Sequence, residues 1–281
     1  MVIDAGRIRR IARQYLETTR FLGVDCVPVK VPEPNPEPTP PRRDYDRVPE
    51  IHTTVRAVPP EPPTRPVVTE TRVARLQGGP PELAAKDKPA ALEALRTRHD
   101  AQCGHCNAVT THTRTVFGEG NPDADLMFVG EAPGAEEDRT GRPFVGRAGR
   151  KLDEIIGAMS LRREDVYIAN VLKSRPPENR TPLPAEVDLC ALFLAEQIRI
   201  IRPKVVVSLG GPATQFMLGT NVGITRLRGN WATYDAGGLV IPVMPTFHPA
   251  YLLRNYTLDT RGKVWSDMQA AMERLANPDY A

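Results

Sequence analysis

Residues 125–149 read DLMFVGEAPGAEEDRTGRPFVGRAG, and this stretch decides the class of fold. It begins with a short apolar run at residues 125–130, which is typical of a buried strand. A turn rich in glycine and proline follows, and a helical pattern starts at residue 146. Strand, loop and helix in this order begin a βαβ unit, which predicts a parallel sheet.

The same alternation continues to the end of the chain. We expect further strands at residues 166–170, 204–209 and 239–244, and helices at 84–98, 146–159, 184–201, 211–218 and 262–275. Helical crossovers between parallel strands cover both faces of their sheet. The prediction is therefore an α/β fold, a three-layer α/β/α sandwich around a four-stranded, mainly parallel sheet. Ligands of such sheets bind at the carboxyl ends of the strands.

The N-terminal part has a different composition and is expected to be an extension outside the core. Residues 4–22 carry apolar residues at helical spacing and predict an amphipathic helix with arginines on its other face. Residues 28–66 hold 13 of the 29 prolines, which predicts a partly extended linker or, alternatively, a proline-rich docking site. We expect a helix within 1–27, a proline-rich linker at 28–82 and one compact domain at 83–281.

Composition limits the class of protein. The net charge is only +3, so any affinity for nucleic acid must come from local clusters of basic residues. There is no run of about 18 apolar residues, the length a membrane span needs, and no apolar stretch of the kind a secretory signal has. These features predict a cytoplasmic protein without a membrane segment, and we expect a monomer.

Four cysteines are too few for a disulfide scaffold in a chain of 281 residues. Cys103 and Cys106 have two residues between them, a spacing that suits zinc and iron–sulfur clusters equally.

Polar and basic residues follow the expected strands. Five basic residues and no acidic one lie between Arg139 and Lys151, with Phe144 among them. This pattern fits a phosphate backbone and a stacked base, or simply a solvated basic face. Asn170 ends the second expected strand, where its amide can read the edge of a pyrimidine or cap a turn. His248 follows the last expected strand.

Residues 130–149, 170–182 and 248–254 together resemble the three signature regions of the family 4, iron–sulfur-containing uracil-DNA glycosylases. The resemblance spans about residues 85–275, in the family's order and spacing. It implies an enzyme that flips uracil out of single- or double-stranded DNA and hydrolyses its N-glycosidic bond. Free uracil and an abasic site would be the products. Two other classes remain open: a protein that binds uracil-DNA without turnover, and a cluster protein for electron transfer.

The resemblance also implies roles for single residues. Glu131 would help to position the attacking water, Phe144 would stack on the flipped uracil, and Asn170 would hydrogen-bond its edge. Glu137 would stand where the 5-methyl group of thymine would go, and His248 would stabilise negative charge on uracil O2. The remaining substrate contacts would be Gly130 and Ala132. The residues expected to contact DNA are Arg147, Lys173, Arg175, Arg180, Leu252, Leu253 and Arg254, with one of the two leucines filling the gap in the duplex.

The family binds a [4Fe–4S] cluster through four cysteines, and Cys103, Cys106 and Cys190 match three of them. The remaining ligand position falls on Ser174. Three outcomes are open. Ser174 ligates iron through oxygen, a less favoured ligand than thiolate. Alternatively, water, His105 or Cys26 completes the site, or the cluster is incomplete or lost. We expect a cluster held mainly by the three cysteines, in a structural role, with zinc as the alternative metal.

Overall fold

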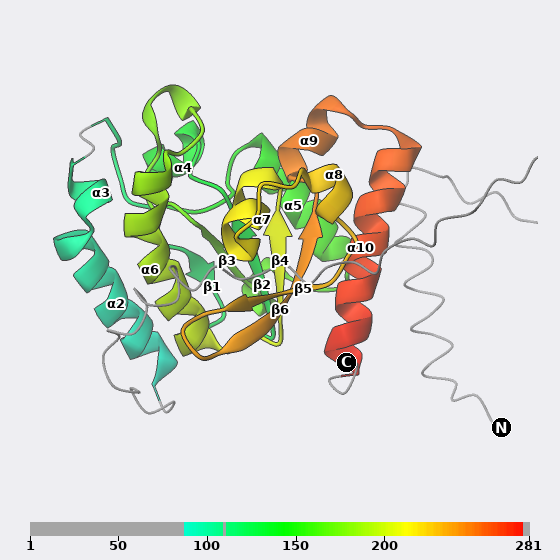
Figure 1. Ribbon diagram of the computed structural model, residues 1–281, viewed down its shortest axis with the longest axis horizontal. Helices are drawn as coiled ribbons and strands as arrows, with labels where there is room; N and C mark the ends of the chain where they lie inside the picture. Colours follow the sequence, from blue (N-terminus) through cyan, green and yellow to red (C-terminus); the bar gives the residue numbers. More distant parts are fainter. Residues whose placement is uncertain (1–86, 109–110, 278–281) are drawn as a thin grey trace, which may run out of the picture. The chain divides into compact units, whose positions relative to one another are not determined.

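The computed structural model describes residues 87–108 and 111–277. Six strands of this part form one sheet in the order β1-β3-β2-β4-β6-β5 (Figure 1). The strands are β1 (Glu119–Gly120), β2 (Leu126–Gly130), β3 (Tyr167–Asn170), β4 (Val205–Leu209), β5 (Ala232–Asp235) and β6 (Val240–Thr246). The four central strands are parallel, and the short edge strands β1 and β5 pair antiparallel to them.

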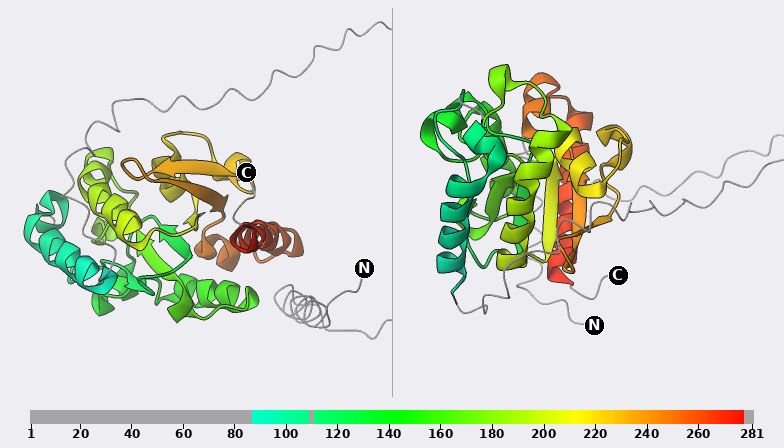
Figure 2. Two further views of the ribbon diagram at one scale, coloured as in Figure 1. Left: turned by 90° about the horizontal axis from the view of Figure 1, so that it is seen from below. Right: turned by 60° about the vertical axis from the view of Figure 1, so that its left-hand side comes forward.

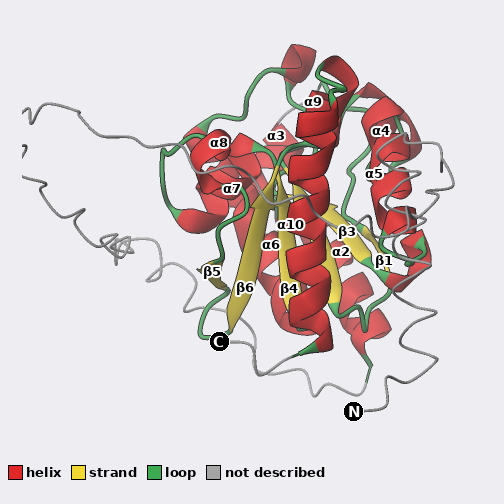
Figure 3. Cartoon of the chain, turned by 90° about the vertical axis from the view of Figure 1, so that its right-hand side faces the viewer, coloured by secondary structure: helices red, strands yellow, loops and turns green. Residues whose placement is uncertain are grey.

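Helices cover both faces of the sheet, as Figure 2 shows from below and Figure 3 from the side of α10. The first face carries α2 (Lys88–Gln102), α3 (Gly104–Ala108), α6 (Pro184–Ile201) and α7 (Gly211–Leu218). The second carries α5 (Arg147–Ala158), α9 (Pro249–Arg254) and α10 (Leu258–Ala276). The other helical segments are α4 (Ala135–Thr140), η2 (Arg163–Asp165), η3 (Pro177–Asn179) and α8 (Ile224–Leu227).

The side chains of each central strand alternate between two cores. In β2, Met127 and Val129 pack toward α2 and α6, whereas Leu126 and Phe128 pack toward α5 and α10. Every residue of β2, β3 and β4 is buried, as expected for parallel strands covered on both faces. The three-layer α/β/α architecture is therefore confirmed.

The sheet is wider than predicted. The four expected strands are present as its parallel centre, but the prediction of four strands is wrong, because β1 and β5 extend the two edges. The expected helices at 184–201 and 211–218 end where α6 and α7 do. The helix expected at 84–98 lies further along, as α2, with Asp87 capping its first turn.

Several expectations fall on residues outside those described. They are the helix at 4–22, the proline-rich linker and the boundaries at residues 27 and 82, which stay predictions. Within the described ranges, no helix combines the length and the apolar character needed to cross a membrane.

The order of the strands fixes where a ligand can bind. From β2 the chain crosses over α5 to β3 on one side, and α6 then carries it back to β4 on the other side of β2. The connections diverge between β2 and β4, which opens a crevice at the carboxyl ends of these strands. Residues 131–134 and 210–212 lie at this crevice.

Candidate active site

A cavity of about 710 Å³ lies at the carboxyl ends of β2, β3, β4 and β6. Its wall includes all of the residues to which the sequence assigned catalysis, and all but Gly130 of those assigned to substrate contact. They are Glu131, Ala132, Glu137, Phe144, Asn170 and His248. Gly130 lies directly behind this wall, at the end of β2.

Gly130 allows two of these side chains to meet. A Cβ atom at this position would lie 2.3 Å from Asn170 Oδ1 and 2.5 Å from Phe144 Cζ, closer than any non-bonded contact allows. Asn170 is paired with Gly130 across the parallel strands β3 and β2. The absence of a side chain at Gly130 therefore lets the amide of Asn170 and the ring of Phe144 approach each other.

Asn170 presents an unused hydrogen-bond acceptor. The residue is 1% exposed, and its Oδ1 atom has no hydrogen-bond partner among the described residues. A buried polar atom without a partner loses the free energy of its hydration, so such atoms are rare except at functional sites. A ligand with an N–H group in the cavity would satisfy it.

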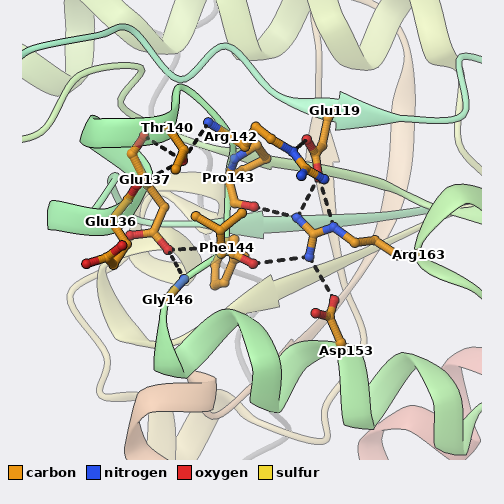
Figure 4. Close-up of polar contacts among 11 residues, drawn as sticks. Glu119, Glu136, Glu137, Thr140, Arg142, Pro143, Phe144, Gly146, Asp153 and Arg163 are labelled. Atoms are coloured by element: carbon orange, nitrogen blue, oxygen red, sulfur yellow. Dashed lines mark hydrogen bonds and ion pairs between the residues drawn. The ribbon is translucent and has the colours of Figure 1, made fainter.

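The loop that carries Phe144 is fixed by two side chains (Figure 4). Phe144 has a left-handed backbone with φ 50°, which an aromatic residue adopts only when its surroundings enforce it. The Arg163 guanidinium donates to the carbonyl oxygens of Pro143 and Phe144 and pairs with Asp153 and Glu119. This arginine holds the aromatic ring at the cavity.

Glu137 fixes the other side of the same loop. Its Oε1 atom accepts from the backbone N–H groups of Val145 and Gly146, both at 2.9 Å. Its Oε2 atom accepts from Gly134 N–H at 3.1 Å. The carboxylate thus connects the turn after β2 to the Phe144 loop while it lines the cavity.

His248 has a defined tautomer. The backbone N–H of Ala250 donates to His248 Nδ1 at 3.1 Å, so the ring proton of the neutral form lies on Nε2. Burial, together with the positive charge of Arg254, lowers the pKa of His248 to about 4, against the opposing effect of Glu137. The imidazole is therefore neutral at physiological pH and offers Nε2–H as a donor. Its ring centroid lies 5.6 Å from that of Phe144.

Glu131 follows β2 directly. Burial raises the pKa of its carboxyl group above the ordinary value. A carboxylate in such a site is a stronger proton acceptor than an exposed one, which suits a group that positions water.

Some of the residues expected to contact DNA are exposed or half-buried, and others are paired with side chains of the protein. Arg147 and Arg254 are exposed, and Leu253 is half-buried beside Arg254. Arg175 donates to Asn179 Oδ1, and Arg180 pairs with Glu186.

Two of these assignments are wrong. Leu252 is fully buried in the core beneath α9, so its side chain is not available to enter a duplex. Lys173 is also fully buried, and its ammonium group donates to Asn170 O at 2.8 Å and to Gln197 Oε1 at 2.5 Å. The Lys173 side chain therefore holds the backbone carbonyl of Asn170 and is not available to bind phosphate.

Three free, buried cysteines converge beside this network. Cys190 Sγ lies 3.6 Å from Cys103 Sγ and 3.4 Å from Cys106 Sγ. His99 joins them, with Nε2 3.3 Å from Cys106 Sγ, and all four donor atoms lie within 4.8 Å of one another. Three thiols and an imidazole fit an iron–sulfur cluster, or a zinc ion, by the chemistry of their donors.

The remaining candidates for a fourth ligand stand elsewhere. Ser174 Oγ and His105 Nε2 hydrogen-bond each other at 3.2 Å, and His105 is not among the four converging donors. The expectation of Ser174 as a ligand therefore has no support, because its hydroxyl is engaged by His105. Cys26 lies outside the described residues.

The sequence interpretation missed His99, Arg163 and Gln197. His99 lies in the last turn of α2, four residues before Cys103, which is the C-cap of that helix, so this spacing was the available signal. No comparable local pattern marks Arg163 or Gln197, because their partners are distant in the sequence.

Comparison with known proteins agrees with this geometry. Residues 117–269 match the Uracil DNA glycosylase superfamily. The chain is 51% identical to the type-4 uracil-DNA glycosylase of Thermotoga maritima over 171 residues. This aligned region covers 60% of this chain and 88% of the relative. It is 44% identical over 160 residues to that of Archaeoglobus fulgidus, covering 56% of this chain and 80% of the relative.

Similarity to the neighbouring family is weaker. A type-5 uracil-DNA glycosylase of Pyrobaculum aerophilum is 32% identical over 163 residues, which cover 52% of this chain and 71% of the relative. The cavity residues and Cys190 lie within residues 117–269, whereas Cys103 and Cys106 precede this matched region. The chain belongs to the uracil-DNA glycosylase superfamily and, within it, to the type-4 uracil-DNA glycosylases.

Proposed function

We propose that this chain removes uracil from DNA by hydrolysis of the N-glycosidic bond, with the cavity at β2 and β4 as its active site. The observation that carries the proposal is the Oδ1 atom of Asn170, which is buried beside Phe144 and His248 and has no hydrogen-bond partner in the part of the chain that the structure describes. The cavity thus offers an acceptor, an aromatic face and a neutral N–H donor. Uracil has a donor at N3, a planar ring and an acceptor at O2, which match these three features.

Recognition of the base rests on Asn170, Phe144 and Glu137. Taking a nucleotide out of the duplex costs a few kcal/mol, and stacking on an aromatic ring returns about 1–3 kcal/mol. Asn170 Oδ1 would accept from uracil N3–H, a group that cytosine lacks. Glu137 would occupy the space beside C5 and exclude the methyl group of thymine. Its three backbone hydrogen bonds would hold it there.

Bond cleavage rests on His248 and Glu131. The bond between C1′ and N1 breaks, and its electron pair leaves with uracil. His248 Nε2–H donates a hydrogen bond to O2, where the negative charge develops, and such a donor is worth about 10²–10³-fold in rate. Glu131 orients a water molecule whose oxygen bonds to C1′. The water loses a proton to this carboxylate, and the uracil anion gains one from solvent after release.

DNA would lie across the mouth of the cavity. Arg147 and Arg254 are placed to contact phosphates, and Leu253 to fill the gap left by the flipped base, in single- or double-stranded substrate. An enzyme of this class would act as a monomer on DNA in the cytoplasm. The paired guanidinium groups of Arg175 and Arg180 would order the loop between β3 and α6.

We also propose that Cys103, Cys106 and Cys190 hold a [4Fe–4S] cluster. When bound, the cluster would cross-link α3 and α6 and would take no part in hydrolysis, since glycosidic cleavage needs no electron. Lys173 connects this region to the active site, because its N–H donates to Cys190 Sγ at 3.4 Å and its ammonium group holds Asn170.

Single-turnover uracil release from an oligonucleotide tests the assignment of residues. Asn170→Ala and His248→Ala should each lower the rate by about 10²-fold or more, since each removes a preorganised hydrogen-bond group. Glu273→Gln, on the exposed end of α10, is the control and should match the parent. Unchanged rates in both cavity variants would reject the proposed site. Binding of uracil-DNA without release would indicate a recognition protein.

A further inference from the structure

His99 occupies an unusual position for a histidine on a helix. It lies in the last turn of α2, is 0% exposed and directs Nε2 toward the cysteine thiols. Its ring packs between Phe117, with centroids 5.8 Å apart, and Phe193, at 4.9 Å. The two aromatic rings limit the imidazole to one orientation.

The other ring nitrogen of His99 is also held. Nδ1 lies 2.8 Å from Asp100 Oδ1, and the same carboxylate oxygen accepts from the Thr115 hydroxyl at 3.0 Å. Histidines that bind metals typically donate their second ring N–H to a carboxylate, which fixes the tautomer and strengthens the ligand. His99 therefore has both a donor atom at the cysteines and the support that a ligand needs.

Ser174, which stands where the family has its remaining cysteine ligand, cannot replace that cysteine as a ligand. Ser174 is fully buried, and its hydroxyl is hydrogen-bonded to His105. A serine hydroxyl would have to lose its proton to match a thiolate, and oxygen is a poorer ligand than sulfur for a cluster. Three cysteines thus leave one ligand position for a different residue.

We propose that His99 is the fourth ligand of the iron–sulfur cluster, which makes the site Cys₃His, and that Ser174 is not a ligand. The inference rests on the proposed [4Fe–4S] cluster and goes beyond it by assigning the ligand that replaces cysteine. A neutral imidazole in place of a thiolate makes the site less negative by one charge. Imidazole ligation accordingly raises the reduction potential of iron–sulfur centres.

The competing explanation is a histidine that only packs in the core and hydrogen-bonds a thiol. Four variants of the full chain separate the two: His99→Ala, His99→Cys, Ser174→Ala, and His99→Ala combined with Ser174→Cys. Each is purified without oxygen and analysed for iron, acid-labile sulfide and zinc. Each is then reduced and examined by pulsed EPR with ¹⁵N-labelled histidine, which detects a nitrogen bound to iron.

The parent and Ser174→Ala should carry the same iron and sulfide and the same strong nitrogen coupling. His99→Ala should lose most of its iron. The double variant should regain the iron through a cysteine at the family's position, without the nitrogen coupling. His99→Cys should keep the cluster, lose the coupling and show a lower reduction potential.

Three results would overturn the proposal. They are a parent without nitrogen coupling, a His99→Ala variant that keeps both iron and coupling, and a parent that holds zinc without iron. Uracil release measured on the same samples separates this inference from the proposed activity. A parent that releases uracil but lacks the nitrogen coupling would reject the ligand assignment alone.

Discussion

At the scale of single residues, Gly130 sets the geometry of the base-binding wall. Gly130→Ala should lower single-turnover uracil release by about 10²-fold, because a misplacement near 1 Å at a catalytic site costs that much. The added Cβ would force Asn170 or Phe144 away. Gly157→Ala is the matched control, since the added Cβ would meet no atom within 4 Å. Replacing this glycine by alanine within α5 should stabilise the helix by about 0.5–1 kcal/mol. Equal activity of both variants would contradict the role of Gly130.

The protonation state of His248 gives a prediction on pH. Its pKa of about 4 means that the ring stays neutral as the pH falls through 6.5, where an exposed histidine would titrate. Glu131 must be ionised, and its raised pKa places the loss of activity on the acid side. The rate should therefore fall on the acid side, as Glu131 takes up a proton, and Glu131→Gln should remove that acidic fall. An inflexion near 6.5 that disappears in His248→Gln would refute the neutral donor.

At the scale of elements, the short helix η2 supports the loop between α4 and α5. Arg163 bridges Pro143, Phe144, Asp153 and Glu119, and lysine cannot reproduce this forked donation. Arg163→Lys should reduce the rate of uracil release by about tenfold while the affinity for uracil-free DNA stays unchanged. Arg162→Lys, at an exposed neighbour, is the control. An Arg163→Lys variant with parental rate and weaker DNA binding would assign this arginine to DNA contact instead.

Some elements could be predicted from local sequence patterns, and others could not. The periodicity of α6 and the apolar runs of the parallel strands were sufficient, because α6 has 18 residues and these strands form the covered centre of the sheet. β1 has only two residues, so no pattern marks it. Lys173 stands in a basic loop, and only the packing of Gln197 and the cysteines reveals that it is buried. The choice of Leu253 over Leu252 likewise depends on the direction of α9.

At the scale of the whole molecule, the family match to known enzymes lies in residues 117–269. The aligned regions cover 88% and 80% of two type-4 relatives but only 60% and 56% of this chain, so the additional length belongs to this chain. Every residue that lines the cavity lies between 131 and 254. A chain truncated to 83–281 should therefore release uracil at the rate of the full chain. A loss of more than tenfold, with the truncated chain still folded by circular dichroism, would show that the N-terminal part contributes to catalysis.

The identity of the released base distinguishes a uracil-specific glycosylase from a protein that only binds uracil-DNA. The full chain is incubated with three oligonucleotides that differ only in carrying uracil, thymine or cytosine at one position, and the products are identified by mass spectrometry. The pairing of Asn170 with N3–H and the position of Glu137 predict free uracil and an abasic site from the first oligonucleotide alone. Intact uracil-DNA after prolonged incubation, or equal release of thymine, would rule out uracil-specific excision at this cavity.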